Sequence, residues 1–401
     1  MAVHSILIMG NMKFLLVLCV VSAGLLGGCA TAELRGSGDL GVVIEREAGS
    51  VLIVNTTRIA VLSRITELGD LSHASVVFSR DQRYAYVFGR DGGLSKIDLL
   101  QDKLEKRIVQ AGNSIGGAIS QDGRWIAVSN YTPGGVKIFA ADTLEQIADI
   151  PASYGEGLLS KVVGLADASD QRFVFSLFDA DQIWVANLHN PQAPQIQKFS
   201  QIGKQPYDAL LTPDGRYYLA GLFGETGLAK LDLWQPETGV NRVLPDYGAH
   251  EEKLPVYKMP HLQGWTASGD WLFVPAVGQH EVLVIDKHTW QLLKRIPVAG
   301  QPVFVTARPD GRQVWVNFAL PDNQLVQVID VKDLSVSKTL QPGKAVLHME
   351  FSPRGETVWL AIRDDNRVAV YDTETLSEIG QLPADKPSGI FFSARANQLG
   401  L

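Results

Sequence analysis

Short apolar segments recur at a regular interval along the chain, and each one ends in a polar turn. Within a segment, apolar and polar residues alternate as in β-strands, whereas a helical repeat would place apolar residues at i, i+3, i+4 and i+7. Spacings of 44, 41, 47, 46, 54, 44 and 42 residues separate the equivalent positions Ile53, Ile97, Ile138, Val185, Leu231, Ile285, Ile329 and Tyr371. A period of this length, filled with strand-length segments, predicts the four-stranded blades of a β-propeller.

A second repeat, a tight turn rich in Asp and Gly, precedes most of these segments. Asp and Gly accept the backbone conformations that close antiparallel strands. The turn sequences are SRDQR (79–83), SQDGR (120–124), ASDQR (168–172), TPDGR (212–216), RPDGR (308–312) and SPRGE (352–356). We therefore expect each blade to run through strand A, the Asp-Gly turn, strand B, a loop, strand C and strand D.

The two ends of the repeat are incomplete in complementary ways. The first unit, from about Gly38 to Ile65, lacks a strand A, and the last unit leaves a spare strand, SGIFFSA, after Pro387. The C-terminal strand is expected to complete the N-terminal blade and close the ring, because closure leaves no long unpaired sheet edge. The prediction is an all-β, eight-bladed β-propeller over residues 38–401.

The composition agrees with one domain of this kind. A chain of 401 residues could form two or three domains, but the uninterrupted repeat favours one toroidal domain, and 46% hydrophobic residues are ample for its core. A net charge of −7 and a pI near 5.7 disfavour electrostatic capture of nucleic acid. Both cysteines, Cys19 and Cys29, precede the repeat, so the propeller has no disulfide framework.

The N-terminal segment is typical of a targeting signal rather than of the fold. Lys13 precedes an apolar run of 15 residues, which is short for a membrane-spanning helix. The run ends in LGGC, a lipobox pattern in which small residues before a cysteine suit cleavage. We expect residues 1–28 to be a lipoprotein signal peptide, Cys29 to become acylated and residues 29–37 to form a tether. An ordinary signal anchor is the alternative.

This segment also predicts where the protein resides. The residues before Met12 look superfluous, which makes Met12 an alternative start to Met1. Ala30, rather than Asp, follows the cysteine, and this favours the outer membrane in enterobacterial-type sorting. The folded body is then expected in the periplasm, attached to the membrane only through its lipid. A homodimer would carry two lipid chains, and stable anchoring usually takes more than one.

Three histidines fall at equivalent positions of the predicted repeat, at the start of strand A. They are His73, His261 and His348, and because strand A is innermost, their side chains should point towards the central channel. Imidazole is a good axial ligand for haem iron. The alternative is that they are polar plugs, hydrogen-bonded within the channel mouth. Familiar catalytic motifs such as the P-loop, HExxH and CxxC are absent.

Loops between strands B and C add cationic and aromatic side chains at the same face. Arg90 and Arg363 occupy equivalent positions, each followed by Asp, so they either recognise ligand carboxylates or brace their own loops through local Arg–Asp pairs. Aromatic rings, which either stack on a flat ligand or cap the blades, come from Tyr131, Phe178, Phe223 and Phe318. Imidazole, guanidinium and aromatic groups around one channel mouth fit a flat, polycarboxylated, metal-bearing macrocycle, which describes a tetrapyrrole.

The stretch LSHASVVFSRDQRYAYVFGRDGGLSKIDL, residues 71–99, resembles a known family. The whole predicted mature chain is similar to the NirF family of heme d1 biosynthesis proteins and to the eight-bladed heme d1 domain of cytochrome-type nitrite reductase. In the reductase, the matching histidine supplies the proximal iron ligand and the arginine of the GRD loop lies near the macrocycle. The resemblance therefore implies an iron-ligating His73 and a macrocycle-binding Arg90.

A second match, PHLQGW at residues 260–265, resembles the reductase segment that holds one distal histidine. His261 takes that place, displaced by one position. The second distal histidine is missing, because Asn317 and Phe318 stand where it would be expected. A CxxCH segment for a c-type haem is also absent. These departures argue against nitrite reduction and favour a binding or maturation role.

The family implies a periplasmic protein that holds dihydro-heme d1 or heme d1, with no separate metal, and passes it on for nitrite reductase maturation. If it also catalyses a late side-chain oxidation, His73, Asp179 and His261 are the candidate catalytic residues, with Asp179 or a channel histidine as the base. The remaining macrocycle-binding candidates are Arg90, Tyr131, Phe178, Phe318, His348 and Arg363. Nothing else in the chain accepts two electrons, so oxidation requires a partner, either another maturation protein or the nitrite reductase.

Two alternatives belong to other functional classes. One is a lipid-anchored propeller that serves as an assembly scaffold without a small-molecule site. The other is a quinoprotein-like or lactonase-like dehydrogenase, which would need a cage of Asp, Glu and Asn at the channel. The loops at the predicted channel mouth carry too few clustered carboxylates for such a cage.

Overall fold

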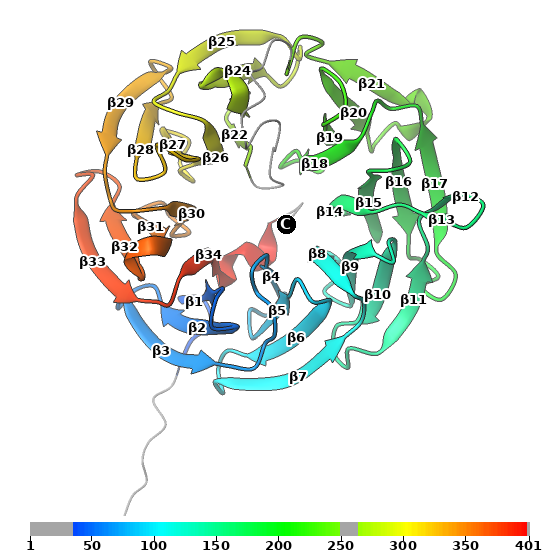
Figure 1. Ribbon diagram of the computed structural model, residues 1–401, viewed down its shortest axis with the longest axis horizontal. Helices are drawn as coiled ribbons and strands as arrows, with labels where there is room; N and C mark the ends of the chain where they lie inside the picture. The colour runs from blue at the N-terminus through cyan, green and yellow to red at the C-terminus, as the bar shows by residue number, and fades with distance from the viewer. Residues whose placement is uncertain (1–34, 249–263, 399–401) are drawn as a thin grey trace, which may run out of the picture. The chain divides into compact units, whose positions relative to one another are not determined.

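The computed structural model describes residues 35–248 and 264–398, and from Ser37 onward these residues belong to one compact unit. Eight four-stranded antiparallel sheets surround a central opening (Figure 1). The predicted eight-bladed propeller is therefore confirmed. The predicted signal peptide and Cys29 lie outside the described residues. None of the helices in the described ranges has the length and apolar character that a membrane span requires.

The blades follow one another around the ring, each beginning with its innermost strand. From the innermost strand outward, blade 1 consists of β34 (Pro387–Phe392), β1 (Leu40–Glu45), β2 (Ser50–Asn55) and β3 (Ala60–Ile65), and blade 2 of β4 (Ser75–Phe78), β5 (Tyr84–Phe88), β6 (Gly93–Asp98) and β7 (Lys103–Val109). Blade 3 consists of β8 (Asn113–Ile119), β9 (Trp125–Thr132), β10 (Val136–Ala140) and β11 (Gln146–Ile150), and blade 4 of β14 (Val162–Ala168), β15 (Arg172–Leu177), β16 (Gln182–Asn187) and β17 (Gln195–Ser200).

Blades 5 to 8 repeat the same order. Blade 5 consists of β18 (Pro206–Leu211), β19 (Tyr217–Leu222), β20 (Leu228–Asp232) and β21 (Val240–Val243), and blade 6 of β22 (Thr266–Ser268), β23 (Trp271–Ala276), β24 (Glu281–Asp286) and β25 (Leu292–Pro297). Blade 7 consists of β26 (Pro302–Ala307), β27 (Gln313–Phe318), β28 (Val326–Asp330) and β29 (Ser335–Leu340), and blade 8 of β30 (Val346–Phe351), β31 (Thr357–Ile362), β32 (Arg367–Asp372) and β33 (Glu378–Pro383). A small hairpin, β12 (Ser153–Gly155) with β13 (Leu158–Leu159), joins blades 3 and 4, and short 3₁₀ turns are η1 (Pro236–Thr238), η2 (Val277–Gln279), η3 (Arg363–Asp365) and η4 (Ser393–Asn397).

The Asp-Gly turns join strand A to strand B at one end of the blades, which we call the lower face. In blade 3, the Gly123 N–H donates to the Ser120 carbonyl at 2.8 Å, and Gly123 has a φ of +74°. The Asp122 carboxylate accepts from the Ser120 hydroxyl at 2.6 Å, which ties the turn together. The B–C loops and D–A connections lie at the opposite end, the upper face.

The C-terminal strand closes the ring as predicted. Strand β34 pairs antiparallel with β1, with Gly41 opposite Phe392 and Ile44 opposite Gly389. A Cβ at Gly41 would lie 2.6 Å from the Phe392 ring, so the pairing requires a glycine there. Both ends of the described propeller therefore meet in blade 1 (Figure 1).

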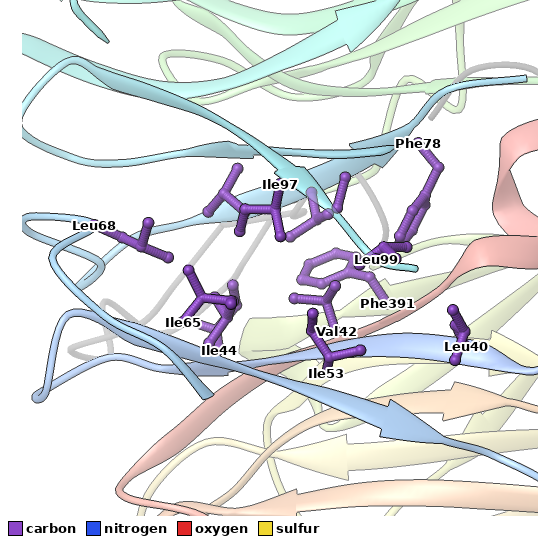
Figure 2. Packing of buried hydrophobic residues seen from close by; sticks show 14 of the residues in the cluster. Leu40, Val42, Ile44, Ile53, Ile65, Leu68, Phe78, Ile97, Leu99 and Phe391 are labelled. Atoms are coloured by element: carbon purple, nitrogen blue, oxygen red, sulfur yellow. The ribbon is translucent and has the colours of Figure 1, made fainter. Parts of the chain in front are cut away.

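The core consists of apolar side chains packed between neighbouring blades. Strands β1 and β2 are buried along their whole length, because blades cover both faces, whereas the outermost strand β7 is largely exposed. Phe391 of the closing strand packs in one cluster with Val42, Ile53 and Phe78, which joins blades 1 and 2 (Figure 2). Each such buried side chain contributes about 1.5–3 kcal/mol.

Turn η4 fastens the closing strand at the lower face. The Ser393 hydroxyl donates to the Ser37 carbonyl at 2.6 Å, and the Ala396 carbonyl accepts from the Arg80 guanidinium. Arg395 pairs with Glu350 at 3.3 Å, and the two side chains are 9% and 14% exposed. Burial raises the pKa of Glu350 to about 7 even though Arg395 acts in the opposite direction.

Replacing Phe392 with Ala should destabilise the propeller. The ring is 2% exposed and packs edge-on against Trp359 at 5.4 Å between ring centres, so its loss leaves a cavity at the closure. We expect a loss of about 3–5 kcal/mol in the free energy of unfolding, measured by urea denaturation. Ile379→Ala, at a side chain that is 51% exposed, should change it by less than about 0.5 kcal/mol. Equal effects of the two substitutions would contradict the closure assignment.

Replacing Glu350 with Gln should remove a pH-dependent destabilisation. The folded pKa of about 7 exceeds the ordinary value of 4.5, so wild-type stability is fully present below pH 4.5 and falls as pH rises through 7. The Glu350→Gln protein should gain up to about 3 kcal/mol over wild type between about pH 5 and about pH 8, measured by urea denaturation at each pH. A stability difference that is the same at both pH values would contradict the raised pKa.

Candidate functional site

The central opening holds two cavities, one towards each face of the propeller. The upper cavity has a volume of about 460 Å³ and lies among the B–C loops and D–A connections. The lower cavity has a volume of about 810 Å³ and lies among the A–B turns and η4. Of the described residues, His348 alone lines both cavities. The predicted channel-mouth residues belong to the upper cavity, which makes it the candidate site.

His73 stands at the mouth of the upper cavity, on the connection from β3 to β4. Its ring is accessible to solvent but is surrounded by the walls of the opening, and this partial desolvation lowers its pKa, as do the nearby charges of Arg90 and Arg46. A histidine with a lowered pKa is neutral near pH 7. His73 therefore offers the nitrogen lone pair that a metal ion needs.

The Asp91 carboxylate holds the His73 connection and the Arg90 loop together. It accepts from the backbone N–H groups of Asp70 at 3.3 Å and Gly93 at 2.9 Å, and from Arg107 at 2.5 Å. The Arg90 N–H in turn donates to the Asp70 carbonyl at 2.8 Å. The acidic residue of the GRD sequence is thus a structural brace that fixes where His73 and Arg90 stand.

The two predicted arginines differ in their local partners. Arg363 forms a bidentate pair with Asp364, at 2.7 and 3.1 Å, and also lines the upper cavity. Asp91, by contrast, pairs with Arg107, and no ion pair to Arg90 occurs within the described ranges. The local-brace interpretation therefore describes Arg363, whereas Arg90 retains its charge for the site.

A third arginine, Arg46, lines the upper cavity and was not among the sequence-based candidates. It follows β1 directly in the B–C loop of blade 1. The sequence does contain a pattern that points to Arg46, because Arg46 precedes Ile53 by seven residues, as Arg90 precedes Ile97. Arginines therefore occupy the B–C loops of three consecutive blades, 8, 1 and 2, beside His73.

The aromatic side chains divide into two groups. Phe318 is 2% exposed and lines the upper cavity directly. Tyr131 and Phe178 instead stand behind Tyr207, which is the cavity-lining member of their cluster. The Tyr131 and Tyr207 hydroxyls lie 3.2 Å apart, and the Phe178 ring meets Tyr207 edge-on at 5.9 Å. Tyr207 was missed as a site residue, and Tyr131 and Phe178 support it.

His348 accepts a backbone hydrogen bond and packs between two aromatic rings. The Ile390 N–H donates to its Nδ1 at 3.2 Å, so the ring proton of the neutral imidazole resides on Nε2. The rings of Phe304 and Phe391 contact it at 5.5 and 5.3 Å between centres, and the side chain is 7% exposed. His348 therefore presents an N–H from a fixed position.

The remaining candidates are less closely associated with the cavity. The Asp179 carboxylate accepts from the backbone N–H and the ammonium of Lys161, at 2.9 and 2.8 Å, and it lines neither cavity. His261 lies outside the described residues. Asn317 bonds Phe304 N–H at 2.9 Å and Val346 carbonyl at 2.8 Å, so it links β26 to β30. In residues 35–248 and 264–398, no cluster of three His, Cys, Asp or Glu side chains could hold a metal ion.

The upper cavity has the features that a flat, anionic macrocycle requires. Its wall includes the glycines Gly116, Gly117, Gly164 and Gly389, at which neighbouring side chains pack directly against the backbone. A Cβ at Gly117 would lie 2.3 Å from the Phe88 ring. The buried Ser75 hydroxyl, also in this wall, has no hydrogen-bond partner among the described residues. Neutral imidazole, guanidinium groups and an apolar, glycine-rich wall fit a tetrapyrrole with carboxylate side chains.

Comparison with known proteins agrees with this site. Residues 35–396 match the family described as Cytochrome D1 heme domain. The chain is 62% identical over 380 residues to Protein NirF of Pseudomonas aeruginosa, covering 94% of this chain and 97% of that protein. It is 59% identical over 386 residues to Protein NirF of Stutzerimonas stutzeri, covering 96% and 99%.

A solved structure shares the architecture. The structure of dihydro-heme d1 dehydrogenase NirN in complex with DHE aligns with a TM-score of 0.79 and 27% identity, covering 91% of this chain and 78% of that one. The chain belongs to the Cytochrome D1 heme domain family and, within it, to the NirF proteins.

Proposed function

We propose that this protein acts in heme d1 biosynthesis by binding dihydro-heme d1 or heme d1 in the upper cavity and delivering it for nitrite reductase maturation. The observation that carries the proposal is that His73 and Arg46 line the upper cavity, while the charges of Arg46 and Arg90 act on His73 from close by. A dihydro-heme d1 dehydrogenase with the same fold supports a ligand of this class.

Each part of the site has a distinct task in binding. His73 would ligate the iron through its lone pair, and the bound macrocycle would supply any redox chemistry. Arg46, Arg90 and Arg363 would pair with carboxylates, each charge-assisted hydrogen bond contributing about 1.5–3 kcal/mol.

The site differs from that of a nitrite reductase in its polar groups. Asn317 and Phe318 replace one expected distal histidine, and Asn317 uses its amide to join two strands. A carboxamide is not acidic, so Asn317 cannot protonate a substrate as an imidazolium would. This difference supports binding and delivery of the macrocycle rather than reduction of nitrite.

We also propose that the protein is a periplasmic lipoprotein, acylated at Cys29 and held at the outer membrane. The lipobox pattern before Cys29 supports this location. The propeller begins at Ser37 on the lower face, where its carbonyl accepts from Ser393.

Replacing His73 with Ala should abolish axial ligation without unfolding the protein, because the side chain is exposed to solvent and packs little. The measurement is a visible absorption titration of the detergent-solubilised protein with dihydro-heme d1, heme d1 and, as a control, haem b. Arg46→Gln should weaken binding of the d1-type macrocycles about tenfold or more. Arg354→Gln, at a side chain that is 82% exposed on the lower face, should leave affinity unchanged.

The outcomes separate the functional classes. Failure of all three macrocycles to bind would overturn the proposal in favour of the scaffold. An unchanged spectrum for His73→Ala would overturn the ligand assignment alone. Conversion of the dihydro-heme d1 spectrum to that of heme d1, after an electron acceptor is added, would add dehydrogenation to binding.

Replacing Cys29 with Ser should abolish lipid attachment. Metabolic labelling with a fatty-acid analogue is expected to mark the wild-type protein, and mass spectrometry should find Cys29 at the mature N-terminus. Cys19→Ser is the matched control, because Cys19 lies within the predicted signal peptide, and it should keep the label. An unlabelled wild-type protein that retains residues 1–28 would establish the signal anchor instead.

A further inference from the structure

Two aromatic side chains form the part of the upper cavity that faces the lower one. His348 lines both cavities, and Phe391 of the closing strand lines the upper cavity. The two rings lie 5.3 Å apart between centres and are tilted by 33°. The chain then continues from β34 into η4, within the central opening (Figure 1). We call His348 and Phe391 the floor of the upper cavity.

Blade 8 holds the closing strand through two side chains of its innermost strand. His348 and Glu350 are two residues apart on β30, so their side chains leave the strand on the same side. The Ile390 N–H donates to His348 Nδ1 at 3.2 Å, and the Phe392 N–H donates to the Glu350 carboxyl. Two alternate N–H groups of β34 are thus bound by side chains of β30, which fixes the closing strand against blade 8.

Arg395 of η4 contacts this arrangement from the side of the lower cavity. Its guanidinium lies 5.2 Å from the centre of the Phe391 ring, and its Nη1 donates to Glu350 Oε2 at 3.3 Å. Attraction between a cation and an aromatic face is strongest where water is excluded, and the Arg395 side chain is 9% exposed. One side chain therefore links Glu350, which holds β34, to Phe391, which lines the candidate site.

We propose that Arg395, together with Glu350, positions the floor of the upper cavity for the macrocycle. The inference rests on the proposed function, because it concerns the same site. Arg395 and Glu350 line the lower cavity, so they act through Phe391 and His348 and are positioning residues. A flat ligand contacts a broad area of the cavity, and a floor that is held rigid beforehand reduces the ordering that binding requires.

Two substitutions at Arg395 and one matched control test this role in the visible absorption titration. Arg395→Gln should weaken binding of dihydro-heme d1 and heme d1 about fivefold. Arg395→Lys should bind within about twofold of wild type, because an ammonium group also lies over aromatic rings and pairs with carboxylates. Ser393→Ala is the control, since Ser393 fastens the same turn through the Ser37 carbonyl, and it should also stay within about twofold.

Glu350→Gln separates positioning from stability. The substitution removes the charge opposite Arg395 and should weaken macrocycle binding about threefold, although the same protein is expected to be more stable than wild type. A purely structural role would instead make affinity follow stability. Glu350→Gln also replaces Arg395→Gln if that protein does not fold.

The histidine rings provide a readout without ligand. In the full-length, detergent-solubilised protein labelled with ¹⁵N at its eight histidines, the His348 signals are identified by their loss in His348→Gln. Arg395→Gln should shift these signals, because the Phe391 ring that contacts His348 loses its support. Ser393→Ala should leave them in place.

Three results would overturn the inference and leave the proposed function intact. They are equal affinities of wild type and Arg395→Gln, equal losses in Arg395→Gln and Ser393→Ala, and His348 signals that do not move in Arg395→Gln. A wild-type protein that binds neither dihydro-heme d1 nor heme d1 would overturn the proposed function and this inference together.

Discussion

The antiparallel pairing of β34 with β1 is the contact on which the rest of the molecule depends. It inserts the last strand of the chain between blades 8 and 2, and so makes these three blades neighbours. Only in that arrangement do the loops that carry Arg363, Arg46 and Arg90 converge on one sector of the upper face, beside His73. The fold and the site thus share one cause, because without the closing strand the residues at the two ends of the sequence would not meet.

The electrostatics of the upper cavity couple iron ligation to carboxylate binding. The guanidinium charges of Arg90 and Arg46 help to keep His73 neutral, which leaves its lone pair available. Carboxylates that pair with these arginines would reduce that field. Once a metal ion is bound to His73, it occupies the lone pair. The arginine charges would therefore favour ligation most strongly before the carboxylates of the macrocycle have paired with them. One set of charges therefore serves both the protein nitrogen and the ligand oxygens.

Much of this arrangement could be predicted from the sequence, because blade spacing and Asp-Gly turns are local signals. The spare strand after Pro387 even predicted closure. Arg46 escaped notice because its blade lacks a preceding strand A in the sequence, so its loop was not aligned with the others. Tyr131 and Phe178 lie on the expected loops but contact Tyr207, which lines the cavity, and this contact depends on the packing of the neighbouring blade. His348 owes its donor role to Ile390, which no local pattern reveals.

Completion of blade 1 by the last strand also fixes the order in which the protein can mature. Until residues Pro387–Phe392 pair with β1, one edge of β1 has no partner strand and blade 8 lacks its complete neighbour. A chain of this design has no closed ring while its C-terminus is still on the ribosome or within a translocation channel. A cavity whose walls come from both ends of the sequence therefore forms only after the ring has closed.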